Sequence, residues 1–372
     1  MSIVEMESKK NIIVLTNKTG GLHSFRKEVM KAIVDAGYEL YISVPDEDER
    51  IKFFEDLGCH IIKTSFDRRG MNPIKDIKLL VEYKRLIKRL HPKAVLTYTI
   101  KPNVYGGIAC RLTHTPQLAN VTGLGDAIEN GGWLQRLTVT LYIIGLRKAS
   151  CVFFQNASNR NSCIKLGIAD SSSVLLPGSG VNLKHHTYQD YPADDGHIRF
   201  LFIGRLLKDK GIEEFFETAK AIKARFPNTE FQILGAIDGP YKSTLDALTK
   251  DGIIKHLGIT TDVRPYIGAV ECTIMPSYHE GMSNVNLESA ANGRPVITTN
   301  VPGCRETVDD DETGYLVKAK DAQGLTDAVE RFVLLPYRHK VLMGQNGRKK
   351  VEREFDRKIV IDAYLNALKR ID

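Results

Sequence analysis

Two glutamates, Glu280 and Glu288, are separated by seven residues and follow an apolar run that is expected to form a strand. Carboxylates accept hydrogen bonds from hydroxyl groups, whereas direct contact with a phosphate would be repulsive. The N–H groups of Ser283, Asn284 and Val285, at the expected start of a helix, are suited to hold phosphate oxygens between the two acids. The segment therefore suggests a ligand that carries both phosphate and hydroxyl groups. Taken alone, the spacing also fits two ordinary surface acids.

A second polar group follows the apolar run at residues 198–203 and comprises Gly204, Arg205 and Lys210. A guanidinium binds a diphosphate as a planar fork and an ammonium binds it as a point charge, and a helix N-terminus beside them favours the same anion. Lys208 is expected to add surrounding charge rather than a direct contact. A solvated basic turn is the alternative interpretation of this spacing.

Alternating apolar runs and helical patterns position these residues. In the first half, the runs expected as strands are residues 11–16, 39–44, 59–63, 94–98, 117–121 and 151–155, and the helical patterns are residues 23–36, 48–57, 73–90, 103–112, 133–148 and 157–166. Such alternation predicts a parallel sheet with helices on both faces.

Residues 174–195 interrupt this alternation with prolines, glycines and acids, and we expect the inter-domain linker there. A second series follows, with strands expected at residues 198–203, 229–234, 253–256, 271–275 and 295–299. The sequence thus predicts two doubly wound, Rossmann-like α/β domains at residues 1–180 and 181–355. A C-terminal helix at 356–372 is expected to pack back toward the first domain. Open sheets of this kind bind ligands at the carboxyl ends of their strands.

Composition excludes several classes of protein. The chain has 372 residues, is 42% hydrophobic and 26% charged, and contains no apolar run of membrane-spanning length. Its first ten residues lack the apolar core of a secretory signal, so a cytoplasmic location is expected. Six scattered cysteines show no metal-ligand spacing and are expected to be reduced, and no metal or cofactor is expected. The net charge of +7 favours anionic partners, but no nucleic-acid motif is present.

The segment from Ser277 to Glu306 resembles the nucleotide-sugar site of family 4 retaining glycosyltransferases, whose acid-x7-acid signature it matches at Glu280 and Glu288. The resemblance extends over essentially the whole chain and implies the GT-B fold, a UDP-sugar donor and metal-independent catalysis. It also implies roles. Arg205 and Lys210 would bind the donor diphosphate, Glu280 would contact the transferred sugar, and Glu288 would contact the ribose hydroxyls.

Two first-domain segments, residues 99–106 and 120–125, resemble a bacterial subgroup that transfers GalNAc, Gal or related sugars to polyprenyl-diphosphate-linked saccharides. On this resemblance, Lys101, Asn103 and Thr122 are acceptor-side candidates. Gly20 and Gly21 would form a loop close to the donor phosphates. Many members carry a histidine where this chain has Val121 and Thr122, which argues against a histidine-assisted mechanism.

Membrane contact is expected through the helix at residues 133–148. Trp133 and Leu134 would enter the headgroup boundary while Arg136 attracts anionic lipid. The basic helix at residues 73–90 is interpreted instead as a helix packed on the core with a solvated charged face.

These features predict a hexosyltransferase that moves GalNAc or Gal from a UDP-sugar to a lipid-linked saccharide in surface-polysaccharide or glycan assembly. It would act as a peripheral protein on the inner face of the cell membrane. One alternative is a sugar-nucleotide epimerase of the same fold, which would release free UDP or a changed nucleotide sugar without an acceptor. Another is a non-catalytic protein that binds phosphate or acidic lipid, against which the acidic pair and its cations argue.

Overall fold

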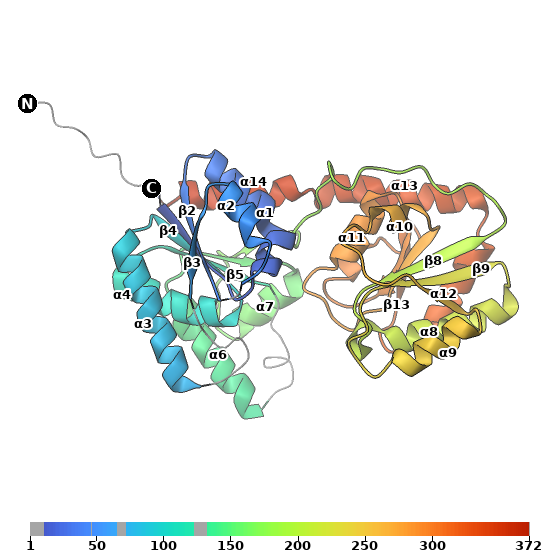
Figure 1. Ribbon diagram of the computed structural model, residues 1–372, viewed down its shortest axis with the longest axis horizontal. Helices are drawn as coiled ribbons and strands as arrows, with labels where there is room; N and C mark the ends of the chain where they lie inside the picture. The colour runs from blue at the N-terminus through green and yellow to red at the C-terminus, as the bar shows by residue number, and fades with distance from the viewer. Residues whose placement is uncertain (1–10, 46, 65–71, 123–131, 372) are drawn as a thin grey trace, which may run out of the picture. The chain divides into compact units, whose positions relative to one another are not determined.

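The computed structural model describes residues 11–45, 47–64, 72–122 and 132–371. The chain divides into two compact units. Unit 1 comprises residues 1–179 and 359–372, and unit 2 comprises residues 180–358. Figure 1 shows that each unit contains a sheet covered by helices.

Unit 1 contains a seven-stranded parallel sheet in the order β3-β2-β1-β4-β5-β6-β7. The strands are β1 (Asn11–Leu15), β2 (Glu39–Val44), β3 (His60–Lys63), β4 (Ala94–Tyr98), β5 (Gln117–Val121), β6 (Cys151–Phe154) and β7 (Val174–Leu175). Its helices are α1 (Thr19–Asp35), α2 (Ile51–Asp56), α3 (Pro73–Leu90), the π-helix η1 (Pro102–Gly106), α4 (Gly107–Thr113), α6 (Gly132–Leu146), α7 (Ala157–Lys165) and α14 (Arg357–Lys369), whose first two residues belong to unit 2.

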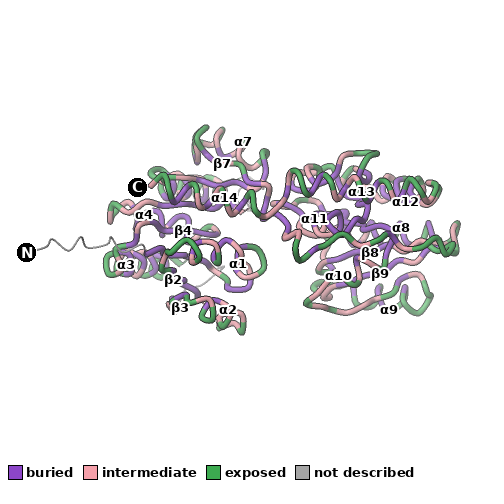
Figure 2. Tube along the Cα trace, turned by 90° about the horizontal axis from the view of Figure 1, so that it is seen from above, coloured by how far each residue is buried: buried purple, intermediate pink, exposed green. Residues whose placement is uncertain are grey.

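Alternate residues of β1 face opposite layers of unit 1, as the period of a strand requires. Ile12 and Val14 pack with residues of α1, α2 and α14, whereas Ile13 and Leu15 pack with α3 and α4. Both faces of the strand are therefore buried, which explains its continuous apolar sequence. Figure 2 shows the buried strands between more exposed helices.

Unit 2 contains a six-stranded parallel sheet in the order β10-β9-β8-β11-β12-β13. The strands are β8 (Ile198–Ile203), β9 (Thr229–Leu234), β10 (Ile254–His256), β11 (Cys272–Met275), β12 (Val296–Thr299) and β13 (Gly314–Val317). The helices are η2 (Lys208–Lys210), α8 (Ile212–Arg225), α9 (Lys242–Lys250), α10 (Arg264–Gly268), α11 (Asn284–Ala291), η3 (Arg305–Thr307), α12 (Ala322–Leu334) and α13 (Tyr337–Glu354).

Both sheets reverse their strand order once, between β1 and β4 in unit 1 and between β8 and β11 in unit 2. In doubly wound sheets, ligands bind beside the carboxyl ends of the strands at this reversal point. The reversal in unit 2 makes β8 and β11 direct neighbours, so the segments that follow them begin at the same edge of the sheet. These are the segments that carry the predicted cations and the first predicted acid.

Three expectations about local structure are wrong. Gly20 and Gly21 lie in the first turn of α1 rather than in a loop. The expected linker at residues 174–195 instead begins with strand β7, which pairs with β6, and from Gly180 onward it belongs to unit 2. Strand β13 was not expected, because it is short and its place at the sheet edge depends on pairing with β12.

Candidate functional site

Lys210 and Glu280 form an ion pair at the carboxyl ends of β8 and β11. The Lys210 ammonium lies 2.6 Å from Glu280 Oε1, and the two side chains are 21% and 17% exposed. The Ser277 hydroxyl donates to the same Glu280 oxygen at 3.0 Å. The structure thus brings together two residues that are 70 positions apart in the sequence: Lys210, which was predicted to bind the diphosphate, and Glu280, which was predicted to contact the sugar.

Two glycines allow the loops around this ion pair to pack closely. Gly211 has φ of +72°, and a Cβ at that position would lie 2.1 Å from the Pro276 carbonyl oxygen. Gly303 has φ of +82°, and a Cβ there would lie 2.3 Å from the Glu280 carbonyl oxygen. Any side chain at either position would force the backbone apart and displace Glu280.

Arg205 follows β8 directly and pairs with Asp238, which follows β9. The distance between Arg205 Nη1 and Asp238 Oδ2 is 2.6 Å, and the side chains are 59% and 52% exposed. Solvent screens a pair this exposed, so it contributes little to stability. Arg205 therefore lies in an exposed, weakly stabilising pair at the end of β8. Gly204 precedes it and donates its N–H to the Leu234 carbonyl oxygen of β9 at 3.0 Å.

Helix α11 begins at Asn284, four residues after Glu280. Ser283 is its N-cap and accepts from the N–H of Asn286 at 3.4 Å. The Ser283 N–H itself donates to the Gly303 carbonyl oxygen at 2.7 Å, so it is occupied within the protein. The first N–H groups of a helix have no intrahelical acceptor, so those of Asn284 and Val285 point out of the helix start, the geometry that the predicted phosphate site requires. Ser283 thus shapes the predicted phosphate site through its cap.

Glu288 lies one turn further along α11, beside His186. Glu288 Oε1 is 4.0 Å from His186 Nε2, and the Glu288 side chain is 26% exposed. Burial raises the pKa of Glu288 to about 7, and the positive charge of Arg357 opposes this shift. The two acids of the predicted signature therefore differ, since Glu280 pairs with a cation and Glu288 lies in a partly enclosed position beside a histidine.

Gly20 and Gly21 lie beside the reversal point of unit 1. A Cβ at Gly20 would come within 2.7 Å of the Arg50 guanidinium, whereas a Cβ at Gly21 would meet no atom within 4 Å. Packing therefore does not require glycine at position 21. The predicted approach of donor phosphate to this turn stays a prediction.

The three acceptor-side candidates occupy different environments. Asn103 is fully buried, donates to the Asn120 carbonyl oxygen at 2.8 Å and accepts from the Thr97 hydroxyl at 2.7 Å. It is a structural residue of η1, and direct contact with an acceptor is ruled out by its burial. Lys101 pairs with Asp76 of α3 at 2.7 Å, and its side chain is 14% exposed. Thr122 is half-buried at the end of β5, and residues 123–125 of that motif lie outside the described residues.

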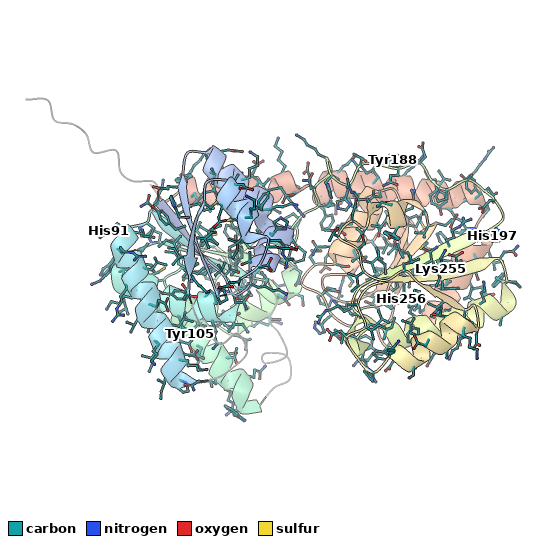
Figure 3. The ribbon with its side chains drawn as sticks, in the orientation of Figure 1. His91, Tyr105, Tyr188, His197, Lys255 and His256 are labelled. Carbon is teal, nitrogen blue, oxygen red and sulfur yellow. The ribbon has the colours of Figure 1, made fainter. Side chains whose placement is uncertain are left out.

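Tyr105 reinforces the environment of Lys101. Its hydroxyl donates to the second Asp76 carboxylate oxygen at 3.0 Å, and Figure 3 labels it at the end of η1. Asp76 thus binds two residues of the 99–106 segment and fixes this segment against α3.

The membrane candidates lie on α6. Trp133 is 71% exposed and Arg136 is exposed, whereas the side chain of Leu134 lies outside the described part of the chain. The interpretation of α3 as a helix packed on the core is only half right, because Ile74 and Ile77 are 68% and 60% exposed. Helices α3 and α6 both pack against η1 and α4 and so belong to one layer of unit 1. No helix within the described ranges is long and apolar enough to span a membrane.

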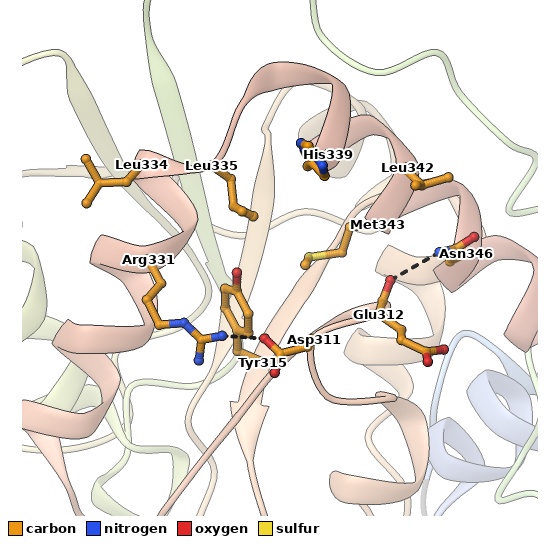
Figure 4. Close-up of a pocket in the computed structure, with 10 residues that line it drawn as sticks. All are labelled: Asp311, Glu312, Tyr315, Arg331, Leu334, Leu335, His339, Leu342, Met343 and Asn346. Carbon is orange, nitrogen blue, oxygen red and sulfur yellow. Dashed lines mark hydrogen bonds and ion pairs between the residues drawn. The ribbon is translucent and has the colours of Figure 1, made fainter.

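A separate cavity of about 540 Å³ lies among β13, α12 and α13 (Figure 4). Arg331 crosses it to pair with Asp311 and lies over the Tyr315 ring at 4.3 Å, while Leu335 and Met343 supply apolar walls. None of the predicted donor residues lines it. The chemistry predicted from the sequence is therefore located elsewhere, at the ends of β8 and β11.

Among residues 11–45, 47–64, 72–122 and 132–371, no group of three or more His, Cys, Asp or Glu side chains is arranged to hold a metal ion. Metal-independent catalysis stays a prediction.

Sequence reasoning missed three residues of this site: Asp238, His186 and Asn292. Asp238 pairs with Arg205 across 33 positions, and Asn292 contacts His186 across 106 positions. No local pattern signals such contacts, since they arise only when the sheet and α11 are assembled.

Comparison with known proteins identifies the class. A solved Anabaena protein, HepE, in complex with UDP and glucose, superimposes with a TM-score of 0.79 at 16% identity, over 97% of this chain and 100% of that chain. The likeness shows that the two units are the Rossmann-like domains of the GT-B fold, as the sequence predicted.

The family follows from two matching family models. Residues 13–156 match the Glycosyl transferase 4-like family, and residues 197–334 match the Glycosyl transferases group 1 family. Together the two matches take in most of the chain, one in each unit. Unit 1 thus contains a Glycosyl transferase 4-like domain and unit 2 a Glycosyl transferases group 1 domain, and the chain is an enzyme of the hexosyltransferase class.

Two curated relatives are bacterial transferases of GalNAc and Gal. The chain is 25% identical to the N,N'-diacetylbacillosaminyl-diphospho-undecaprenol alpha-1,3-N-acetylgalactosaminyltransferase of Campylobacter jejuni, over 96% of this chain and 98% of the relative. It is 26% identical to the UDP-Gal:alpha-D-GlcNAc-diphosphoundecaprenol alpha-1,3-galactosyltransferase of Escherichia coli, over 82% of this chain and 79% of the relative. The predicted resemblance to bacterial GalNAc and Gal transferases is confirmed.

Proposed function

We propose that this glycosyltransferase moves GalNAc or Gal, with retention, from a UDP-sugar to a polyprenyl-diphosphate-linked saccharide in surface-polysaccharide or glycan assembly. The observation that carries the proposal is the Lys210–Glu280 pair, which lies at the reversal point of the sheet in unit 2 and directly before the start of α11. The names of the two curated relatives support the donor and acceptor classes.

Different residues bind the diphosphate, the sugar and the ribose of the donor. Arg205, Lys210 and the first N–H groups of α11 stabilise the negative charge that develops on the diphosphate as the bond to the sugar breaks. Glu280 accepts hydrogen bonds from sugar hydroxyls. Glu288 accepts hydrogen bonds from the ribose hydroxyls, and the acceptor hydroxyl attacks from the face that the diphosphate leaves.

Both cations already have carboxylate partners, so the donor diphosphate competes with these carboxylates when it binds. Arg205 exchanges Asp238 for the diphosphate, whereas Lys210 keeps Glu280 and shares its charge between that carboxylate and the diphosphate. These existing pairs hold both cations near their working positions before the donor arrives, which lowers the entropic cost of binding.

Lipid-linked acceptors require access to a membrane surface, and we propose that unit 1 supplies it. Ile74 and Ile77 on α3 and Trp133 on α6 are exposed apolar side chains on two helices of one layer, and Lys78 and Arg136 are exposed on the same helices. Such a combination favours interfacial binding to anionic lipid at the inner face of the cell membrane.

The proposal is tested with a panel of UDP-sugars, in which UDP release is measured with and without a polyprenyl-diphosphate-linked saccharide. The expected result is release that depends on the acceptor and is fastest with UDP-GalNAc or UDP-Gal. A changed nucleotide sugar without acceptor would indicate an epimerase. Failure of every UDP-sugar to bind would overturn the donor assignment.

A further inference from the structure

The segment that follows Val181 is fixed against α11 by buried cations. Arg294, which is fully buried, donates to the carbonyl oxygens of Gln189 at 3.0 Å and Asp190 at 2.7 Å. Arg348 donates to the carbonyl oxygens of His186 at 2.8 Å and Ala291 at 2.7 Å. Because these bonds tie the segment to the C-terminal end of α11, His186 has a defined position beside that helix. Figure 3 labels Tyr188 on the same segment.

A chain of hydrogen bonds determines which nitrogen of His186 carries the proton. Gln189 Nε2 donates to the Arg264 carbonyl oxygen at 3.4 Å and to Asn292 Oδ1 at 2.9 Å, which fixes the orientation of both amides. Asn292 Nδ2 then donates to the Glu288 carbonyl oxygen at 2.6 Å and to His186 Nδ1 at 3.1 Å. Since Nδ1 accepts a hydrogen bond, the proton of a neutral imidazole lies on Nε2.

The Nε2 proton faces the acid that the donor would use. Nε2 is 4.0 Å from Glu288 Oε1, and the two side chains are 9% and 26% exposed. The terminal torsion of a glutamate is broad, so rotation of the carboxyl group brings an oxygen within hydrogen-bond distance. A neutral N–H group in this position favours an ionised, oriented carboxylate without adding a second charge to a buried site.

The charged surroundings keep the imidazole neutral. Burial, together with the charges of His185, Arg264 and Arg357, lowers the pKa of His186 to about 4, and Asp262 opposes this shift. The His185 ring lies 5.1 Å from that of His186. Near neutral pH the ring therefore acts as a fixed dipole rather than as a cation.

We propose that His186 is a positioning residue for donor recognition: its Nε2–H group orients Glu288 so that the carboxylate accepts hydrogen bonds from the ribose hydroxyls. The inference rests on the proposed function, which assigns Glu288 to those hydroxyls. His186 would thus contribute to recognition of the ribose from a segment that lies outside the acid-x7-acid signature.

Three substitutions at His186 separate this role from a purely structural one. Glutamine places an amide N–H near the position of Nε2, asparagine places an amide oxygen near the position of Nδ1, and phenylalanine keeps the ring without either nitrogen. UDP affinity is measured by calorimetry between pH 6 and 8.5, on variants whose thermal unfolding shows that they are folded. His185→Gln, at the exposed neighbouring position, is the matched control.

We expect His186→Gln to bind UDP as the wild type does, and His186→Asn and His186→Phe to bind about three- to tenfold more weakly. The pH below which affinity falls is expected to move up by about half to one unit in the two weak variants, since Glu288 loses a group that stabilises its charge.

The opposite order, in which His186→Asn retains affinity and His186→Gln loses it, would show that the ring only accepts the Asn292 hydrogen bond and would overturn the proposal. Unchanged affinity in all three variants would do the same. The Glu288→Gln variant separates a failure of the ribose assignment from a failure of the role given to His186. If that variant binds UDP normally, the ribose assignment in the proposed function fails. If it weakens UDP binding while the His186 variants do not, only the role of His186 fails.

Discussion

Replacement of Lys210 by alanine tests the diphosphate site most directly, because the structure predicts separate effects on stability and turnover. The substitution leaves Glu280, whose side chain is 17% exposed, without its cation at 2.6 Å, while the Ser277 hydroxyl still donates to its carboxylate. An unpaired, largely buried carboxylate lowers the free energy of unfolding by about 1 to 3 kcal/mol. Loss of one group that stabilises the leaving diphosphate raises the activation free energy by about 2 to 4 kcal/mol, or about 30- to 1,000-fold in kcat/KM.

The assay combines urea unfolding with the rate of acceptor-dependent UDP release. Lys208→Ala is the control, since that side chain is 69% exposed and pairs with Glu213 at 3.2 Å, so its loss is expected to change stability by less than about 0.5 kcal/mol. Adding Glu280→Gln to Lys210→Ala removes the unpaired charge and is expected to restore stability but not turnover. A folded Lys210→Ala protein with near-wild-type turnover would refute the reasoning and make Lys210 a structural partner of Glu280 only.

Three further predictions concern the acids, the first helix and the membrane layer. Glu288→Gln is expected to weaken UDP binding, whereas Glu280→Gln reduces sugar transfer more than UDP binding; equal UDP defects by calorimetry would contradict this division. Because the pKa of Glu288 is raised from 4.5 to about 7, the native state binds more protons than the unfolded state between these pH values, and the wild type loses stability as pH rises through that range. The Glu288→Gln variant lacks this loss, so its stability relative to the wild type should increase with pH in urea titrations. Gly21→Ala is expected to raise the melting temperature slightly, since alanine favours helix by up to about 1 kcal/mol, but to lower turnover if the donor approaches the turn; unchanged kcat/KM would remove this residue from the site. Trp133→Ser and Ile77→Ser should reduce binding to anionic vesicles and activity on long-chain acceptors while sparing a short soluble acceptor, and equal loss on both acceptors would argue against membrane contact.

The strands were predictable where both faces are buried. The sequence boundaries of β2, β4, β5, β8 and β9 agree with the structure to the residue, because a strand buried on both faces requires a continuous apolar run. Strand β13 lacks such a run and is four residues long. Its Gly314 faces the Val296 carbonyl oxygen, where a Cβ would lie 1.8 Å away, so its identity depends on a partner that the local sequence does not reveal.

Predictions from residue type were wrong at positions where tertiary packing determines the structure. Gly20 and Gly21 suggested a loop, since glycine is a poor helix former, yet the helix begins at Thr19. Asn103 suggested a polar contact with substrate, yet both ends of its amide are used within the sheet edge and η1. In each case the residue type was compatible with two structures, and long-range contacts selected between them.

The signature itself could be found from the sequence, but not the difference between its two acids. The two glutamates, with seven residues between them, are brought to different partners: Glu280 to Lys210 after β8, and Glu288 to His186 in the segment after Val181. Lys210 pairs with Glu280 until a phosphate competes for the charge of the ammonium. Glu288 lies beside a neutral imidazole instead, and because burial raises its pKa to about 7, its charge changes with pH in that range. Binding of the diphosphate and of the ribose therefore respond to different conditions: salt should weaken the diphosphate contacts, and acid should weaken the ribose contacts. Measuring UDP and uridine affinity across both variables separates them, because uridine lacks the diphosphate. Uridine binding that falls with salt but not with acid would contradict this division of the donor between the two acids.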